Sequence, residues 1–366
     1  MTRLSRAQTQ ERNRAKVLAA ARAEFAERGF RDAKIDSIAE RAGFTRGAVY
    51  SNFPGKRALY FAVLADLAEN APAPRHAEPG RTAREALGAL ARAWVARLPL
   101  ADIGERDGSA RLGMDLMPEI ATEVRTRLPF AQLMRLNAIL LGLALERMEP
   151  PGTPDGRMVR VAEATLTTLH GASQMAAAAP GFVEPFNVVK ACERLAELDL
   201  GDRWPTPPII PQARRVDEPW SPPVATDALR GEPARLAGDG AVAVLGLHRL
   251  SAAEEAVRAA RPGDTITVVV VTGDPAELTP LARLTLADFW HCLRQAFPHS
   301  AWPGLHVVFD SAGSLAAAAG VPAVSDGTEV AVRIDNGRIV ARAEGYGACH
   351  AATSVEHQPS RSTGSS

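Results

Sequence analysis

Residues 35–57 read IDSIAERAGFTRGAVYSNFPGKR, and the pattern of these residues predicts the fold of the N-terminal part of the chain. Its first apolar residues are spaced i, i+3, i+4 and i+7, as on one face of a helix: Ile35, Ile38, Ala39 and Ala42. Gly43 follows, and a glycine at that place readily takes the left-handed conformation that ends a helix. Phe44 can then fill the corner beside the turn. The pattern predicts a short helix that ends in a tight turn.

A second short helix is predicted directly after that turn. Thr45 is suited to cap it through its hydroxyl group. Arg46 and Tyr50 are four residues apart and share one face, whereas Val49 points towards the core. The Pro-Gly pair at 54–55 then ends the helix. Two short helices joined in this way form a helix-turn-helix, a motif that places its second helix in the major groove of DNA.

The residues around the second helix also favour a nucleic-acid partner. Gly47 lies in its first turn and lets the backbone approach a partner closely. Lys56 and Arg57 stand at the start of the following helix, where a phosphate can meet basic side chains and free helical N–H groups. Residues 1–57 hold 13 Lys and Arg against 6 Asp and Glu, a net of +7, which leaves −7 for the rest of a chain whose total is zero. A basic head on an acidic body is expected when only one end meets phosphate.

Residues 25–64, and especially the run AERGFRDAKIDSIAERAGFTRGAVYSNFPGKRALYFAVL, resemble the N-terminal domain of TetR-type transcriptional regulators. The resemblance rests on the glycine turn, the Gly-Ala-Val-Tyr segment, the Asn-Phe-Pro stop and the lysine that follows. It implies that a set of matching residues faces DNA, with Thr45, Arg46, Gly47 and Asn52 near the groove and Tyr50 and Lys56 at phosphates. Lys34 departs from the family, which usually has a threonine there. A lysine can reach a phosphate but cannot cap the helix. The alternative is that the polar residues of this set are ordinary solvated residues of a three-helix domain.

Length and composition are those of a soluble globular protein with two or three domains. The chain has 366 residues, of which 46% are hydrophobic and 23% are charged. Its three cysteines, Cys192, Cys292 and Cys349, are far apart and form no CxxC pair. We therefore expect neither a disulfide framework nor a metal site, and no cofactor. The N-terminus lacks an apolar core and the apolar runs are too short to span a bilayer, so we expect a cytoplasmic protein.

Residues 71–200 are predicted to be helical after a Pro-rich loop at 71–80. Apolar periodicity places helices at 85–98, 119–128, 130–148, 157–179 and 185–198. In length and position this region resembles the effector-binding and dimerisation domain of the TetR family, whose last two helices usually form the dimer interface. The resemblance implies an effector pocket between the earlier helices, with candidate lining residues Trp94, Met114, Met117, Phe130 and Met134. The alternative is that these residues, like His170, belong to an ordinary core.

Residues 201–235 are predicted to form a stiff, extended linker, because eight prolines fall within 201–233 and apolar periodicity is weak. A regulator of ordinary length for the resembled family would end just before it. Strand and helix patterns then alternate over 236–350, with TITVVVVT at 265–272 as a buried central strand. Asp-Asn-Gly at 335–337 predicts the turn of a closing hairpin. Residues 351–366 are expected to be a disordered polar tail.

The order β-α-β-α-β-α-β-β of residues 236–350 resembles a thioredoxin-like domain. The catalytic cysteine pair of that fold would follow the central strand, where this chain has Thr-Gly-Asp-Pro at 272–275. The helix predicted at 276–297 carries Cys292 beside His291, and a lone thiol there could act as a redox sensor only if its pKa were lowered. This domain is therefore expected to associate or dock rather than to catalyse a reaction.

These observations predict an all-α helix-turn-helix head and an all-α ligand and dimer domain over residues 1–200, followed by a smaller α/β thioredoxin-like domain. The head covers 1–70 and the helical domain 71–200. The expected function is that of a homodimeric TetR-type regulator, usually a repressor, which binds a palindromic operator and is released by a small apolar effector. The protein is not expected to be an enzyme. The alternative is a redox-responsive or enzymatic fusion in which the C-terminal domain carries the activity.

Overall fold

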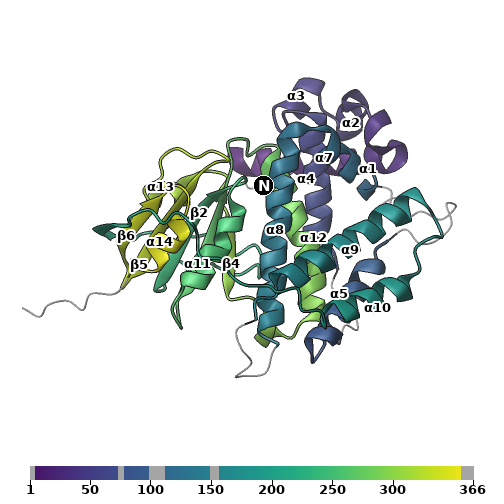
Figure 1. The fold of residues 1–366 in the computed structure, drawn as a ribbon. Coiled ribbons are helices and arrows are strands. Elements are labelled where there is room, and N and C mark those ends of the chain that lie inside the picture. The colour runs from purple at the N-terminus through teal and green to yellow at the C-terminus, as the bar shows by residue number, and fades with distance from the viewer. Residues whose placement is uncertain (1–4, 73–77, 99–111, 149–155, 356–366) are drawn as a thin grey trace, which may run out of the picture. The chain divides into compact units, whose positions relative to one another are not determined.

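The protein forms two compact units in the computed structural model, which describes residues 5–72, 78–98, 112–148 and 156–355 (Figure 1). The first, which we call the helical unit, comprises Met1–Trp204 together with Thr272–Pro303. The second, the sheet unit, comprises Pro205–Val271 and Gly304–Ser366. A helical N-terminal part and an α/β C-terminal part agree with the sequence prediction.

The helical unit contains the helix-turn-helix motif predicted from the sequence. Its described α-helices are α1 (Arg6–Asp32), α2 (Ile35–Ala42), α3 (Arg46–Tyr50), α4 (Lys56–Glu69), α5 (Ala83–Val95), α7 (Leu116–Thr122), α8 (Val124–Glu146), α9 (Val159–Ala178), α10 (Pro185–Leu195) and α12 (Leu278–Ala296). A short 3-10 turn, His299–Ala301, follows α12. The regular part of α1 ends at Gly29, whose φ of 73° is left-handed.

Helix α8 begins earlier than the sequence predicts. The boundary between α7 and α8 is Glu123, whose backbone is extended. Its side chain accepts a hydrogen bond from the backbone N–H of Arg125. The predicted break at Pro129 is wrong, because that proline lies buried inside the helix. A proline in this position removes one intrahelical hydrogen bond without necessarily ending the helix. The predicted helices at 119–128 and 130–148 are thus divided at a different residue.

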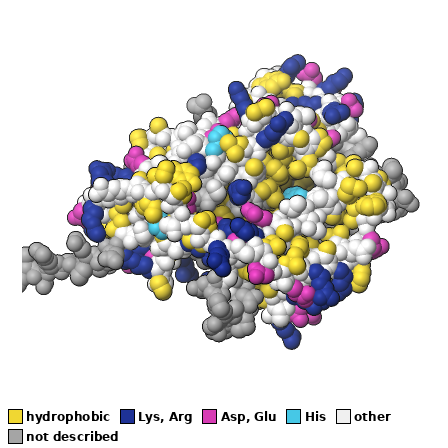
Figure 2. All heavy atoms as spheres, in the orientation of Figure 1, with side chains coloured by type: hydrophobic (Ala, Val, Ile, Leu, Met, Phe, Trp, Pro, Cys, Tyr) yellow, Lys and Arg dark blue, Asp and Glu magenta, His cyan; other side chains and the backbone are white. Residues whose placement is uncertain are grey.

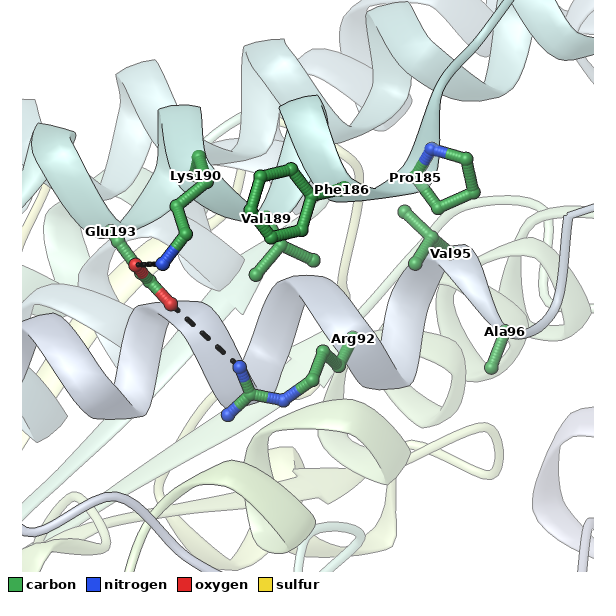
Figure 3. A pocket seen from close by; sticks show the side chains of 8 residues that line it. All are labelled: Arg92, Val95, Ala96, Pro185, Phe186, Val189, Lys190 and Glu193. Atoms are coloured by element: carbon green, nitrogen blue, oxygen red, sulfur yellow. Dashed lines mark hydrogen bonds and ion pairs between the residues drawn. The ribbon is translucent and has the colours of Figure 1, made fainter.

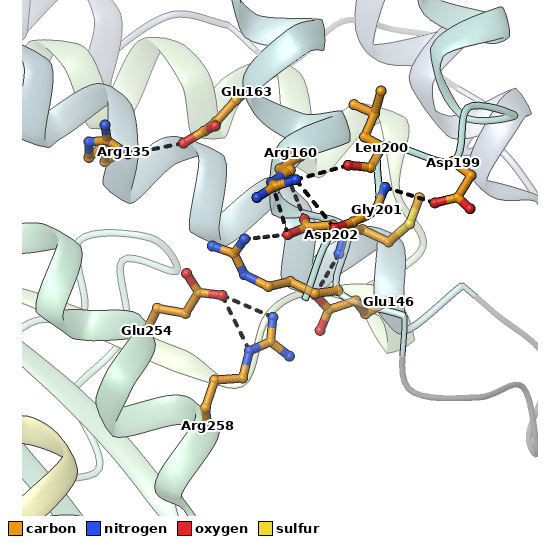
Figure 4. Close-up of polar contacts among 12 residues, drawn as sticks. Arg135, Glu146, Arg160, Glu163, Asp199, Leu200, Gly201, Asp202, Glu254 and Arg258 are labelled. Carbon is orange, nitrogen blue, oxygen red and sulfur yellow. Dashed lines mark hydrogen bonds and ion pairs between the residues drawn. The ribbon is translucent and has the colours of Figure 1, made fainter. Parts of the chain in front are cut away.

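The residues that follow α10, at the end of the first segment of the helical unit, contact the start of α9 (Figure 4). The Asp202 side chain is only 4% exposed, and its Oδ2 accepts the backbone N–H of Arg160 at 2.7 Å. Asp202 also pairs with the guanidinium group of Arg157, while the Arg160 side chain donates to the carbonyl oxygen of Leu200 at 3.0 Å. A carboxylate that accepts an N–H group at the start of a helix stabilises that helix. These contacts attach the residues after α10 to the helical unit.

The sheet unit is built on six strands in the order β1-β6-β5-β2-β3-β4. The strands are β1 (Arg214–Pro219), β2 (Gly240–Gly246), β3 (Thr265–Val271), β4 (Leu305–Phe309), β5 (Glu329–Asp335) and β6 (Arg338–Glu344). β2, β3 and β4 are parallel, whereas β5 pairs antiparallel with β2 and β6, and β1 pairs antiparallel with β6. A 3-10 turn (Leu250–Ala252) and the helices α11 (Ala253–Ala259), α13 (Ser314–Ala318) and α14 (Ala348–Thr353) complete the unit. Its thioredoxin-like identity stays a prediction.

The core of the sheet unit follows the predicted pattern. Every residue of β2 is buried, as are six of the seven residues of β3, which is typical of strands covered on both faces. Asn336 and Gly337 have positive φ angles of 48° and 71° and form the predicted turn between β5 and β6. These elements could be predicted because their signals are local.

Two predictions for the C-terminal half are wrong in part. Residues 214–219 of the predicted linker form strand β1, and Trp220 after it is buried, so this stretch is packed. An edge strand pairs through its backbone on one side only, so a charged sequence without apolar alternation can form one. Residues 351–353 of the predicted tail belong to α14 and are buried. The tail from residue 356 onwards lies outside the described residues.

The largest departure concerns α12. The sequence assigns this helix to the C-terminal domain, since it connects the neighbouring strands β3 and β4. In the structure it packs in the helical unit against α4, α5 and α8 (Figure 1). Thirteen of its 19 residues are buried, so it is enclosed on more than one side. The prediction of one continuous domain over 236–350 is therefore wrong for residues 272–303.

Helix α8 is the one helix of the described chain that is long and apolar enough to cross a membrane. Within the fold, 67% of its most apolar stretch is buried. Such burial is typical of a core helix.

Candidate nucleic-acid interface

The turn between α2 and α3 forms as its residues predict. Gly43 is left-handed, with φ 71° and ψ 34°, and the backbone N–H of Phe44 donates to the carbonyl oxygen of Ala39 at 2.9 Å. The Thr45 hydroxyl group accepts the backbone N–H of Ala48 at 3.3 Å and caps α3. The turn thereby fixes the direction of α3 relative to α2.

One face of α3 presents predicted DNA-binding residues to solvent. The Arg46 side chain is 62% exposed and Tyr50 is 39% exposed. The Arg46 guanidinium carbon lies 5.5 Å from the centre of the Tyr50 ring, and one guanidinium nitrogen is 3.5 Å from Asp36. The Tyr50 hydroxyl group and then Asp36 raise the pKa of Arg46. Gly47 is exposed, and a Cβ atom there would have only the Thr45 hydroxyl oxygen, at 3.9 Å, within 4 Å.

Two other predicted residues make contacts within the domain. The Asn52 side-chain amide donates to the carbonyl oxygen of Ala48 at 2.9 Å, so it closes the end of α3. The Lys56 ammonium group donates to the carbonyl oxygen of Arg31 at 2.9 Å and lies 4.7 Å from the centre of the Phe30 ring. Burial lowers the pKa of Lys56. Sequence reasoning missed the partners of Lys56 because they come from another part of the chain, whereas Ala48 lies only four residues before Asn52.

Lys34 and Arg57 differ in how far they are available to a ligand. Lys34 is exposed and precedes α2 without a capping bond from its side chain. Arg57 instead pairs with Glu277 at 2.6 Å and with Glu123 at 3.0 Å. The Arg57 charge is thus neutralised by two carboxylates, which does not favour the phosphate contact expected from its position.

A polar hollow of about 530 Å³ lies beside the motif and is lined by Thr9, Gln10, Asn13, Ser51 and Asn52. It joins the first turns of α1 to the end of α3. No motif points to these α1 residues, because polar residues at this spacing are common along the solvent face of a helix. Figure 2 shows Lys and Arg side chains over the end of the helical unit that carries α2 and α3.

The five candidate effector residues are not gathered at one site by the described contacts. Trp94 and Phe130 both lie edge-on to the His170 ring, with ring centres 4.8 and 6.5 Å away. The Trp94 ring N–H donates to the Ser173 hydroxyl group at 2.9 Å. Burial lowers the pKa of His170, and Asp288 of α12 opposes this shift. The three methionines are half-buried: Met134 in α8, Met114 just before α7, and Met117 within it.

A different groove, of about 520 Å³, lies between α5 and α10 (Figure 3). Its lining is apolar apart from three charged side chains: Val95, Ala96, Pro185, Phe186 and Val189, with Arg92, Lys190 and Glu193. The carboxylate of Glu193 pairs with Lys190 at 2.8 Å and with Arg92 at 3.8 Å. None of the predicted effector residues lines this groove.

Cys292 is fully buried in α12. Its sulfur accepts a hydrogen bond from the Arg97 guanidinium group at 3.4 Å. Burial raises the pKa of the thiol, although Arg97 acts in the opposite direction. These surroundings disfavour the thiolate form that a redox sensor needs.

The geometry of α2 and α3 is that of a helix-turn-helix DNA-binding domain. Residues 17–63 match the family described as bacterial regulatory proteins, tetR family. The N-terminal domain is therefore a TetR-family helix-turn-helix domain, as the sequence resemblance implied.

Curated proteins are similar to this chain over short stretches. The chain is 41% identical over 54 residues to the uncharacterized HTH-type transcriptional regulator YdgC of Bacillus subtilis, which covers 15% of this chain and 28% of that protein. It is 45% identical over 65 residues to the HTH-type transcriptional regulator SrpR of Pseudomonas putida, which covers 18% of this chain and 30% of that protein. The chain thus spans less than a third of the length of either relative.

Solved structures align with about half of the chain. A TetR transcriptional regulator from Rhodococcus sp. RHA1 is 18% identical, with a TM-score of 0.33, over 52% of this chain and 95% of that one. NalD of Pseudomonas aeruginosa, a secondary repressor of the MexAB-OprM multidrug efflux pump, is 21% identical, with a TM-score of 0.31, over 51% and 95%.

Proposed function

We propose that this protein is a sequence-specific DNA-binding transcriptional regulator that acts in the cytoplasm and inserts α3 into the major groove. The match of residues 17–63 to the family carries the proposal. The exposed face of α3 supports it, because Arg46 can read base edges and Gly47 allows the backbone to come close to DNA.

The remaining predicted contacts place the motif on the duplex. Thr45 and Asn52 lie near the groove in this proposal, and Tyr50 and Lys34 contact phosphates. The Lys56 ammonium group has three N–H donors, and one of them bonds the carbonyl oxygen of Arg31. The other two can bond a phosphate. Phosphate contacts fix register, and base contacts specify sequence.

We further infer a homodimer formed through α9 and α10. Large apolar side chains are exposed there, with Met175 at 41%, Phe182 at 71% and Phe186 at 62%. Burying them against a second copy would remove them from water. Two-fold symmetry then calls for a palindromic operator with half-sites one or a few helical turns apart.

Regulators of this type are usually repressors, and in this proposal a small apolar effector releases the protein from DNA. The effector would bind beside Trp94 and Phe130, where His170 offers a weakly basic ring between two aromatic side chains. It must favour a spread of the two heads that no longer fits the operator, which requires different affinities for the two states.

The test is an in vitro selection of DNA fragments with the full-length protein, followed by binding measurements on variants. We expect one palindrome to be enriched. Arg46→Ala should weaken binding to that palindrome more than binding to random DNA, whereas Lys56→Ala should weaken both and lower the salt slope by about one unit. Thermal unfolding of each variant controls for the contact between Lys56 and Arg31. Failure to enrich any sequence, or equal losses of Arg46→Ala on both DNAs, would contradict the proposal.

The competing interpretation gives the activity to Cys292 in a redox-responsive or enzymatic fusion. The buried position and raised pKa of this thiol speak against it. A thiol-labelling assay of the native protein tests the point. Labelling of Cys292 faster than that of a free cysteine would favour the redox interpretation.

A further inference from the structure

Helix α12 belongs to the helical unit although it lies far from the other helices of that unit in the sequence. It follows β3 and precedes β4, which are parallel neighbours in the sheet. Its packing partners are α4, α5 and α8. Both ends of α12 are therefore tied covalently to the sheet unit, through residues 272–277 and 297–303, while its side chains belong to the core of the helical unit.

The helix that α12 covers most is α4, which follows directly after the helix-turn-helix. Eight consecutive residues of α4, from Ala58 to Ala65, are buried. A helix that packs on one side buries only one stripe, so a continuous buried run means that α4 is covered all around. Helix α1 packs on α4 as well, the Tyr60 hydroxyl group of α4 donates to the carbonyl oxygen of Leu112, and α12 contributes a large part of the remaining cover.

Ion pairs join α12 to α4 near each end of α4. Glu277, just before α12, accepts a hydrogen bond from Arg57 at 2.6 Å, and only 24% of the Arg57 side chain is exposed. Arg283 of α12 donates to Glu69 at 2.7 Å. Because Arg57 and Glu69 stand in the first and last turns of α4, these two contacts fix its direction as well as its distance from α12.

Helix α8 and the end of α5 hold α12 in the same way. Asn137 is 2% exposed in a helix of apolar residues, and its amide donates to the backbone carbonyl oxygen of Thr285 at 3.3 Å. This bond satisfies one end of the buried amide, while its Oδ1 has no hydrogen-bond partner among the described residues. The Arg97 guanidinium group bonds both the side chain and, at 3.1 Å, the backbone carbonyl oxygen of Asp288.

We propose that α12 is a built-in effector helix: seated between α4, α5 and α8, it holds the helix-turn-helix in its DNA-binding position, and the sheet unit regulates DNA binding by shifting it. This inference rests on the proposed function. The 14 residues of α4 span about 21 Å, so a tilt of about 5° moves one end by roughly 2 Å. A palindrome read by two heads is sensitive to such a change in spacing.

A single substitution tests the link at the motif. Glu277→Gln removes the charge that α12 offers to Arg57 and keeps the shape of the side chain. We expect about fivefold weaker binding to the selected operator, with little change on random DNA. Amides of α12 should exchange hydrogen faster while those of β3 stay unchanged. Glu218→Gln is the matched control, because Glu218 pairs with Arg342 at 2.9 Å across β1 and β6 of the sheet unit, whereas α4 and α12 belong to the helical unit.

A cross-link tests the seated state directly. Glu69→Cys combined with Arg283→Cys breaks the second ion pair and offers two accessible thiols, while the three native cysteines are buried. Before cross-linking, we expect the variant to bind the operator about fivefold more weakly than the native protein. A short bismaleimide bridge between the two thiols should restore the native affinity.

The outcomes separate this inference from the proposed function. If the native protein enriches no operator, the proposed function itself fails. If it does, and folded Glu277→Gln binds the operator like the native protein, α12 is only a part of the core and the inference is wrong. An operator affinity that the bridge fails to restore would overturn it as well.

Discussion

Glu255 in α11 is a buried carboxyl group from which we expect a pH dependence of the stability of the sheet unit. It is 8% exposed, and its Oε2 has no hydrogen-bond partner among the described residues. Burial, and then the nearby carboxylate of Glu329, raise its pKa to about 7. Glu329 is itself buried and accepts a hydrogen bond from Arg249 at 2.8 Å. The fold therefore favours the protonated form of Glu255.

We expect the sheet unit to be more stable at pH 5 than at pH 8. The pKa of Glu255 is about 7 in the folded state against 4.5 for an unperturbed glutamate, so the folded state binds the proton more tightly. The stabilisation is complete below about pH 4.5 and is lost as the pH rises through 7. Glu255→Gln should remove most of this pH dependence. Urea unfolding at both pH values measures the stability. Hydrogen exchange of the β3 amides is a second, separate measurement on the sheet unit.

Glu254 offers the control for this prediction. It is also buried, but its carboxylate bonds Arg258 at 3.2 Å (Figure 4). Glu254→Gln should therefore keep the difference in stability between pH 5 and pH 8. A native pH dependence that survives Glu255→Gln would assign the effect to another group.

Single residues were predictable from the sequence when their partners are near in the chain. Thr45 caps α3 through Ala48, three residues on, and Gly43 takes the left-handed angle that its place in the turn requires. Lys56 was not, because the carbonyl oxygen it bonds lies 25 residues away on Arg31. Local patterns carry no information about such a partner, so the structure is needed to find it.

At the scale of elements, the two glycines of the motif have different tasks. Gly43 has a φ of 71°, which strains any residue with a Cβ atom, whereas Gly47 lies in a helix without a positive φ. Gly43→Ala should therefore destabilise the domain by about 1 kcal/mol. Gly47→Ala should leave stability unchanged or raise it by about 0.5 kcal/mol, and should still weaken operator binding through the added methyl group.

Thermal unfolding and DNA titration of the two variants separate these effects. Gly43→Ala should bind the operator normally once it is folded at low temperature. Normal operator binding by Gly47→Ala would show that this face of α3 does not approach DNA closely.

Element boundaries depended on which signal was stronger. Gly29 ends the regular part of α1 through its left-handed φ, but Pro129 does not end α8, because a proline inside a helix costs one hydrogen bond that packing can offset. Strand β1 could not be predicted from the sequence, because this edge strand of mostly charged residues has neither an apolar alternation nor a run of β-branched residues.

For the whole molecule, the unit to which α12 belongs could not be read from its own residues. Its apolar pattern predicts a buried helix, and both a sheet and a helical unit can bury one. The choice is made by partners such as Asn137, Arg57 and Glu69, which lie 148 to 220 residues earlier in the sequence. The sequence therefore predicts the helix and not its place.

The packing of α12 leads to a prediction about truncation after Trp204, which leaves a chain of ordinary regulator length. This truncation removes α12 together with the sheet unit and uncovers the buried run of α4. We expect the truncated chain to melt at a lower temperature, to bind an apolar dye and to bind the operator more weakly, because exposed core surface destabilises the fold. A synthetic peptide of residues 272–303, added in trans, should restore operator binding, whereas a scrambled peptide should not. Native melting and native affinity of the truncated chain would instead mean that α4 has enough cover without α12, and that α12 only fills space which the helical unit can close without it.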